Sequence, residues 1–241
     1  MNKYYIILIC ILSSLATNIS ILFTFIKREN SKHILQICLS STIVLMISIS
    51  IFELIPESIK YIKDTNNIIK FTLSLIIILL CKMIINKIDH NIEEESSLKR
   101  IGILSAIAMF IHNVPEGIIC ATTSFKNYKI GLKICLIIMI HNIPEGLSIS
   151  MPIYNSGESR VKAFLYTLFS SSGELFGILL SILFYNYINN IIMYLLLITT
   201  AGIMLSVSIN KIKPLLNSYQ NKKYNLIGYL IGLIISYIIL K

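Results

Sequence analysis

The sequence predicts an all-α integral membrane protein with eight transmembrane helices. Of its 241 residues, 55% are hydrophobic and 14% are charged, whereas soluble domains usually contain about 25% charged residues. Apolar stretches of about 20 residues, the length that crosses a bilayer as a helix, recur eight times along the chain. So few charges cannot cover a water-facing surface of this size, and we therefore expect the chain to lie in a membrane.

The expected spans follow one another with short connections, which predicts a single transmembrane domain over residues 1–241. In chain order they cover residues 4–26, 34–55, 68–85, 101–123, 130–153, 161–185, 188–209 and 224–240. The first apolar run continues well past its small residues at 14–16, which favours an uncleaved span over a signal peptide. The longest polar connection, 86–100, is expected to be a short cytoplasmic loop.

The formal net charge of +9 lies mostly in the short segments between spans and at the chain ends. The first, third, fifth and seventh connections hold more Lys and Arg than the termini and the even connections, so the positive-inside rule places both termini outside the cytoplasm. This distribution argues against a nucleic-acid partner. The abundance of Ile, Asn and Lys indicates an AT-rich genome, and the absence of targeting elements favours the plasma membrane of a bacterium. Oligomeric state is not determined by the sequence, and a homodimer stays open.

The five cysteines, at positions 10, 38, 81, 120 and 135, all fall inside apolar runs and form no Cys-x-x-Cys pair. Buried cysteine commonly behaves as a small hydrophobic residue. We therefore expect packing roles and no disulfide framework.

Two near-identical segments, His-Asn-Val-Pro-Glu-Gly at 112–117 and His-Asn-Ile-Pro-Glu-Gly at 141–146, lie in the middle of the fourth and fifth spans. Residues four apart share one face of a helix, so His112 pairs with Glu116, and His141 with Glu145. If the two helices are antiparallel, the pairs meet at one depth and offer two nitrogen and two oxygen ligands, a set that suits zinc. Each pair alone could be a structural contact inside a bundle, but two copies at matching depth favour an ion pathway.

Other polar residues of these spans extend the candidate site. Asn113 and Asn142 could offer amide oxygens to a second ion, and Glu174 in the sixth span is a buried carboxylate that a cation would stabilise. Glu53 and Glu57, at the end of the second span, could line an entrance or have an ordinary interfacial role.

Pro115 and Pro144 each remove a backbone donor, so we expect a break in both motif helices that frees the carbonyls of Ile111 and Ile140 toward a hydrated channel. The glycine that ends each motif would let neighbouring helices approach closely.

At these residues the chain resembles the ZIP family of zinc and iron transporters, closest to its bacterial ZupT-type branch. The resemblance implies eight spans in a 3+2+3 arrangement with an inverted repeat, uptake of metal into the cytoplasm, and alternating access by sliding of one helix group against another. It also implies a binuclear centre. One metal ion would use His112, Glu116, His141 and Glu145, and a second would use Asn113, Asn142, Glu145 and Glu174, with Glu145 bridging. Asn210 and Lys211 stand where the family tends to have an acidic pair, which puts an acidic exit path in doubt.

The predicted function is therefore transport of a divalent metal ion, with the metal as substrate and no catalytic cofactor. Zinc is favoured, but iron, manganese, cobalt and cadmium suit similar ligands. The alternative is an intramembrane zinc metallohydrolase, in which a buried zinc ion activates water. Against it, the chain has no His-Glu-x-x-His segment and both motif carboxylates are used as ligands.

Overall fold

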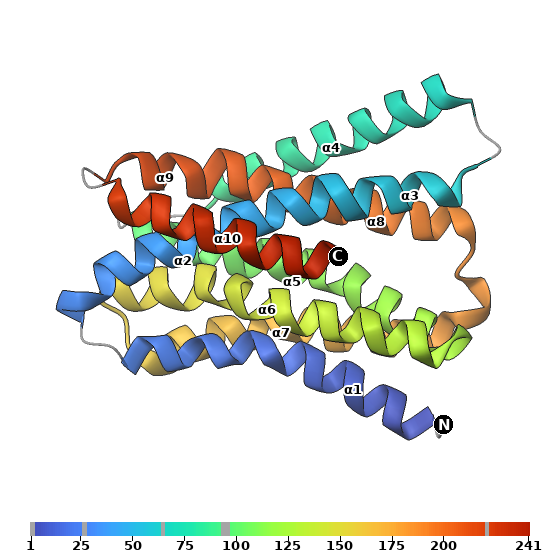
Figure 1. The fold of residues 1–241 in the computed structure, drawn as a ribbon, viewed down its shortest axis with the longest axis horizontal. Coiled ribbons are helices and arrows are strands. Elements are labelled where there is room, and N and C mark those ends of the chain that lie inside the picture. Colours follow the sequence, from blue (N-terminus) through green and yellow to red (C-terminus); the bar gives the residue numbers. More distant parts are fainter. Residues whose placement is uncertain (1–2, 26–27, 64–65, 93–96, 220–221) are drawn as a thin grey trace.

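A computed structural model describes residues 3–25, 28–63, 66–92, 97–219 and 222–241, and the regular structure in these ranges is helical (Figure 1). In chain order the elements are α1 (Lys3–Leu15), the 3₁₀ helix η1 (Ala16–Phe25), α2 (Arg28–Ile49), the π-helical η2 (Ser50–Leu54), α3 (Ile55–Tyr61), α4 (Asn67–His90), α5 (Ser97–Lys126), α6 (Tyr128–Asn155), α7 (Arg160–Phe184), the 3₁₀ helix η3 (Tyr185–Tyr187), α8 (Asn190–Val207), the π-helical η4 (Ser208–Ile212), α9 (Lys213–Asn217) and α10 (Lys223–Leu240).

Within the described residues, eight helical segments are long and apolar enough to cross a membrane, which confirms the predicted fold class. Several extend beyond the predicted ends: α4 continues to His90 and α5 begins at Ser97, so the polar connection is shorter than the predicted 86–100. The run Glu93–Glu95 lies outside the described residues. Large apolar side chains such as Phe71 and Met83 on α4 are exposed, as expected for a surface that faces lipid.

Asparagine and serine side chains set the start of several helices. Asn66, Asn127, Ser159 and Asn189 each accept a hydrogen bond from a backbone N–H of the helix that follows. Such caps satisfy donors that the first helical turn leaves unpaired. Asn127 alone separates α5 from α6, so these two helices form a tight antiparallel hairpin.

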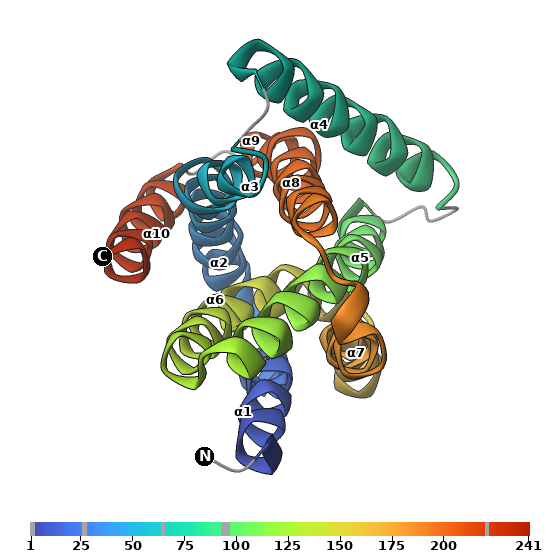
Figure 2. The same ribbon diagram turned by 90° about the vertical axis from the view of Figure 1, so that its right-hand side faces the viewer.

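The helices divide into two groups, which Figure 2 shows from the end. The motif group consists of α1, η1, α5, α6 and α7, whose main contacts are α5 with α7, α5 with α6, and α6 with η1. The flanking group consists of α2 to α4 and α8 to α10, whose main contacts are α2 with α10, α4 with α8, and α3 with α8. The two groups meet where α2 packs on α6 and α8 on α5.

Glycine brings helix backbones close together in the motif group. A Cβ atom on Gly117 of α5 would overlap the carbonyl oxygen of Glu174, and one on Gly177 of α7 would overlap that of Val114. Gly146, the other motif glycine, faces the carbonyl of Thr17 in the same way. The expected close approach at both motif glycines is confirmed.

The second and seventh spans share an unusual local structure. Each contains one π-helical turn, Ser50–Leu54 or Ser208–Ile212, and each turn is followed two residues later by a proline, Pro56 or Pro214. π-Helical turns are rare and are frequently found at functional sites. Their matching positions in the second span of the first three helices and of the last three agree with an inverted repeat.

Two expectations for the motif hairpin were wrong. The structure joins Cys120 and Cys135 by a disulfide, because these cysteines lie seven residues before and eight residues after Asn127 and therefore face each other across the hairpin. The helices also stay α-helical through Pro115 and Pro144. A proline removes only one helical hydrogen bond, and the remaining bonds carry each helix past it.

Candidate metal centre

The two His-Asn-x-Pro-Glu-Gly segments meet at the contact between α5 and α6. His112 Nε2 lies 3.2 Å from Glu145 Oε2, and His141 Nε2 lies 3.3 Å from Glu116 Oε1. Within α5 the His112–Glu116 separation is longer, at 4.0 Å. The four side chains are at most 4% exposed. His112 therefore lies closer to Glu145 on the other helix than to Glu116 on its own helix.

The arrangement leaves several polar atoms without a hydrogen-bond partner among the described residues. They are His112 Nδ1, both ring nitrogens of His141, Glu116 Oε2 and Glu145 Oε1. An unsatisfied buried polar group costs about 1–3 kcal/mol, so this cluster would be expensive as a purely structural contact. Ligand atoms of His112, Glu116 and Glu145 lie within 4.8 Å of one another. A divalent cation fits both the charge and the donor types of this cluster.

Asn142 and Glu174 belong to a second polar cluster beside the first. Asn142 Nδ2 donates to Glu174 Oε2 at 2.9 Å and to the Ser13 carbonyl at 3.1 Å, and the Glu174 side chain is fully buried. Asn113 Nδ2 donates to the Ser170 carbonyl at 3.0 Å. With the amide nitrogens held in this way, both asparagine oxygens and Glu174 Oε1 have no partner among the described residues. Oxygen donors of this kind are suited to a hard or borderline cation.

A cavity of about 100 Å³ joins this centre to the flanking group. It is lined by Glu116 and His141 from the motif group and by Glu53 and Glu57 from the second span. Both side chains line a cavity that contains two candidate ligands, and Glu57 also forms an ion pair with Lys60 at 2.6 Å. Glu53 lies in the π-helical turn η2, which changes the direction in which a side chain leaves the helix. Hydropathy alone gives no sign of that turn.

Lys211 lies near the C-terminal end of the seventh span, at a position where the family resemblance led us to expect an acidic residue. Lys211 Nζ donates to Asp89 Oδ2 at 2.8 Å, and Arg100 Nε donates to Asp89 Oδ1 at 2.9 Å. Asp89 therefore links α4 to α5 and to the seventh span. Sequence reasoning missed this cluster, because its members lie far apart in the chain and none belongs to a motif.

Comparisons with known proteins match this chain to transporters. A family model described as ZIP zinc transporter matches residues 84–240. The chain is similar to the zinc transporter ZupT of Streptococcus mutans, with 30% identity over 93% of this chain and 92% of the relative. It is also similar to the zinc transporters ZupT of Clostridium perfringens, with 29% identity over 97% and 94% of the two chains, and of Nitratidesulfovibrio vulgaris, with 40% identity over 56% and 50%.

The matched family consists of transporters and not of enzymes, so the alternative of an intramembrane metallohydrolase is not supported. The resemblance that the doubled motif indicated extends over nearly the whole chain. The chain therefore belongs to the ZIP family of zinc transporters.

Proposed function

We propose that the protein takes up zinc across the plasma membrane into the cytoplasm, and that the ion binds His112, Glu116, His141 and Glu145 on its way. The observation that carries the proposal is the crossed pairing of two buried imidazoles with two buried carboxylates, at 3.2 and 3.3 Å, from antiparallel helices. Two imidazole nitrogens and two carboxylate oxygens form a set typical of four-coordinate zinc. The relatives' description as zinc transporters supports the choice of this metal.

A second ion would bind the oxygens of Asn113 and Asn142 together with Glu174, with Glu145 bridging the two ions. Support comes from the protein contacts that hold both amide nitrogens and leave the oxygens without partners among the described residues. Iron and manganese accept the same oxygen donors, so we propose them as competing substrates for this centre.

The proposed route begins at the acidic cavity beside Glu53 and Glu57. A cleft lined by carboxylates raises the local concentration of cations. The cavity lies at the C-terminal end of the second span. The excess of Lys and Arg in the odd connections predicts that this end faces outward, with both termini outside the cytoplasm. We therefore propose that the cavity opens at the outer face.

Zinc flux into proteoliposomes that contain the purified protein tests the proposal. We expect His141→Ala to lower the initial rate at least about ten-fold, since loss of even an outer partner of a metal site costs 10–100-fold. His90→Ala is the matched control, because His90 is exposed at the end of α4, and it should transport like the parent protein. A folded His141→Ala protein with undiminished flux would contradict the assignment of the site.

Competition by iron, manganese, cobalt and cadmium in the same assay tests selectivity. We expect the ions that take imidazole and carboxylate ligands to slow zinc uptake, and magnesium to have no effect, since magnesium releases its water reluctantly. Inhibition by magnesium as strong as that by cadmium would contradict a site of this composition.

A further inference from the structure

Three of the five cysteines meet outside the metal centre just described. Cys10 comes from α1, Cys120 from α5 and Cys135 from α6, and all three are at most 1% exposed. Cys120 and Cys135 form the disulfide, and Cys10 Sγ lies 3.1 Å from Cys120 Sγ and 3.5 Å from Cys135 Sγ. Three helices thus bring three sulfur atoms to one point, while Cys38 and Cys81 lie in a different apolar cluster.

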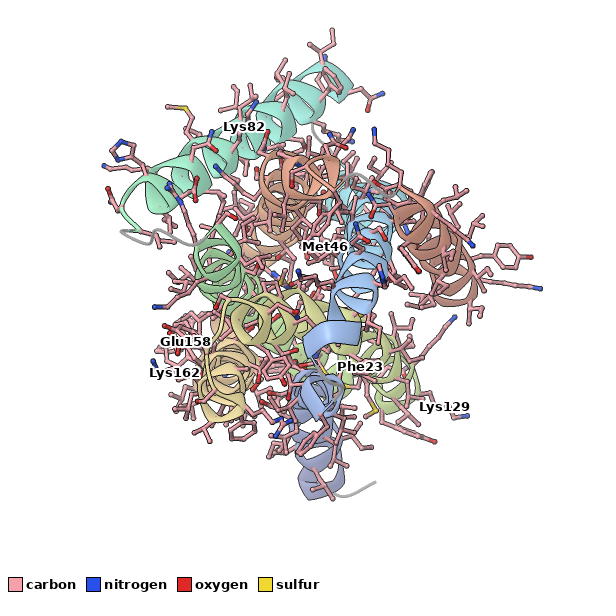
Figure 3. All side chains as sticks on the ribbon, turned by 90° about the vertical axis from the view of Figure 1, so that its left-hand side faces the viewer. Phe23, Met46, Lys82, Lys129, Glu158 and Lys162 are labelled. Carbon is pink, nitrogen blue, oxygen red and sulfur yellow. A yellow bond between two sulfur atoms is a disulfide. The ribbon has the colours of Figure 1, made fainter. Side chains whose placement is uncertain are left out.

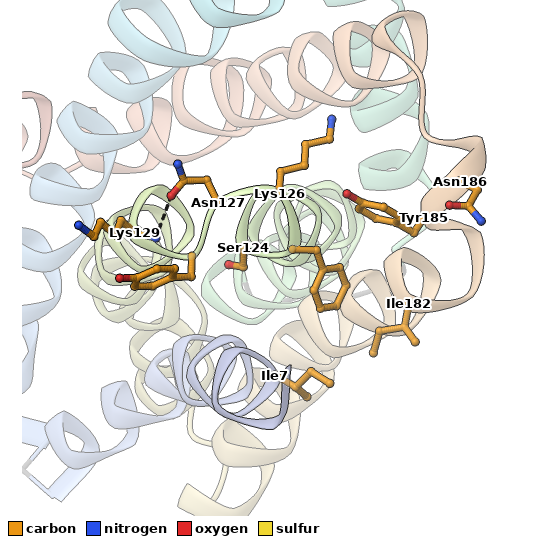
Figure 4. A pocket seen from close by; sticks show the side chains of 10 residues that line it. Ile7, Ser124, Lys126, Asn127, Lys129, Ile182, Tyr185 and Asn186 are labelled. Carbon is orange, nitrogen blue, oxygen red and sulfur yellow. Dashed lines mark hydrogen bonds between the residues drawn. The ribbon is translucent and has the colours of Figure 1, made fainter. Parts of the chain in front are cut away.

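The surroundings of the cluster are apolar with one polar edge. Ile138 and Ile178 pack against the sulfurs, and Ser124 Oγ lies 3.9 Å from Cys135 Sγ. Ser124 also lines an open cavity of about 900 Å³ at the end of the α5–α6 hairpin, together with Lys126 and Asn127 (Figure 4). The cysteines therefore lie one layer beneath a cavity that opens at the surface of the protein.

We propose that Cys10, Cys120 and Cys135 form a site for one soft metal ion, such as Cd²⁺ or Zn²⁺, when the Cys120–Cys135 disulfide is reduced. The three ligand sulfurs lie within 4.8 Å of one another, and metal–sulfur bonds of about 2.3 Å can span such a set from a central ion. Thiolate ligands select soft cations. This site shares no residue with the His–Glu centre and does not depend on the proposed transport function.

The chemistry of the two states is balanced. A dithiol or phosphine reductant supplies two electrons and two protons arrive from solvent, which breaks the sulfur–sulfur bond and leaves three thiols. Binding of a divalent ion then releases the three thiol protons to solvent, because the thiolate and not the thiol is the metal ligand. The bound site, with three thiolates and one divalent ion, carries one net negative charge. Disulfide and metal exclude each other, because the disulfide uses two of the three donors.

Cadmium titration of the purified full-length protein in detergent tests the site. The ultraviolet charge-transfer band of cadmium–thiolate bonds is the readout, because the imidazole and carboxylate ligands of the other centre do not produce it. We expect the reduced protein to develop this band with one equivalent of Cd²⁺ and the disulfide form to show none. Cys10→Ser should weaken the apparent affinity at least about ten-fold, and Cys120→Ser should do the same.

Cys38→Ser and Cys81→Ser are the matched controls and should keep the full band, since both cysteines are buried elsewhere. Absence of the band in the reduced protein would overturn the proposal, as would a band that Cys10→Ser leaves unchanged. His112→Ala should retain the band, so failure of the thiol site and failure of the transport site are distinguishable. A Cys10→Ser protein that does not fold is replaced by Cys10→Ala, with the same readout.

Discussion

The motif group and the flanking group are built from similar apolar helices, but they bury different side chains. Among the described residues, every buried histidine and glutamate belongs to the motif group: His112, Glu116, His141, Glu145 and Glu174. The flanking group buries mostly hydroxyl groups that donate to carbonyls of their own helix, as Ser40 and Ser50 do. The candidate metal ligands therefore come from the motif group, and the flanking group packs against that group.

This difference bears on how an ion could cross. A centre whose ligands all come from one group can keep its coordination while that group moves against its neighbour, so the geometry favours the sliding motion that the family resemblance implies. The flanking group contributes Glu53 and Glu57 to the cavity beside the centre. We expect the two groups to respond very differently to substitution.

The largest difference is expected between Glu116→Gln and Glu53→Gln. Glu116 contacts histidines of both motifs, so its loss should weaken zinc binding by about 100-fold, the upper range for perturbed metal sites. Glu53 only lines the cavity, and its loss should lower the uptake rate less than about ten-fold with little change in Kd. Equal losses of zinc affinity, measured by calorimetry on the purified proteins, would remove the distinction between the groups.

The next largest effect concerns packing. Gly177→Ala in the motif group would drive a Cβ into the backbone carbonyl of Val114, whereas Gly202→Ala in the flanking group would meet the Cys81 side chain at 3.0 Å. Overpacking typically costs 1–3 kcal/mol, so we expect Gly177→Ala to lower the thermal midpoint in detergent clearly. Gly202→Ala should lower it less, because its nearest contacts, at 3.0–3.2 Å, need a shift of only a few tenths of an ångström. A smaller loss for Gly177→Ala would contradict the packing argument.

A smaller effect is expected where the groups join. Arg100 of the motif group pairs with Asp89, which also holds Lys211 of the flanking group. Partly exposed ion pairs contribute about 0.2–1 kcal/mol, so Asp89→Asn should change the transport rate by less than about five-fold. The Kd for zinc should stay the same, because Asp89 is not a candidate ligand. Flux and binding measured on one preparation separate the two parameters, and a changed Kd would argue against a contact that acts only between the groups.

The smallest effect is expected at an ion cluster within the motif group. Glu158 and Lys162 lie side by side (Figure 3), and Glu158 accepts a hydrogen bond from Lys162 at 2.7 Å. Glu158 also accepts one from Lys99 at 3.1 Å, and the two cations hold the pKa of Glu158 below its ordinary value of 4.5. A lowered carboxylate pKa stabilises the folded state above the ordinary pKa, and that stabilisation is lost as pH falls through the folded-state pKa. Glu158→Gln should flatten the decrease in thermal midpoint below about pH 4.5. An unchanged decrease would assign the acid sensitivity to other groups.

The sequence predicted the spans and the meeting of the two motifs at one depth, but not the crossed pairing of histidine and glutamate. Hydropathy reports which segments lie in lipid, and a four-residue spacing places histidine and glutamate on one face of each motif helix. Lateral packing is different, because lipid-facing and buried positions are both apolar. The contact of Cys10 with the disulfide, the Asp89–Lys211 pair and the cavity beside Glu53 depend on which helices are neighbours. The disulfide could have been predicted from the sequence, because Cys120 and Cys135 are nearly equidistant from Asn127 in the chain.

The single-residue connection at Asn127 limits how this protein can vary in length. In both crossed pairs, His112–Glu145 and Glu116–His141, the two residues are placed symmetrically about the turn, so both pairs depend on one register between α5 and α6. One residue inserted at the turn would shift one helix by about 1.5 Å and rotate it by about 100°, which moves histidine and glutamate off the shared face together. Insertions and deletions should therefore be tolerated in the connections between other spans and excluded at Asn127, where the length of the connection sets the register of the metal ligands.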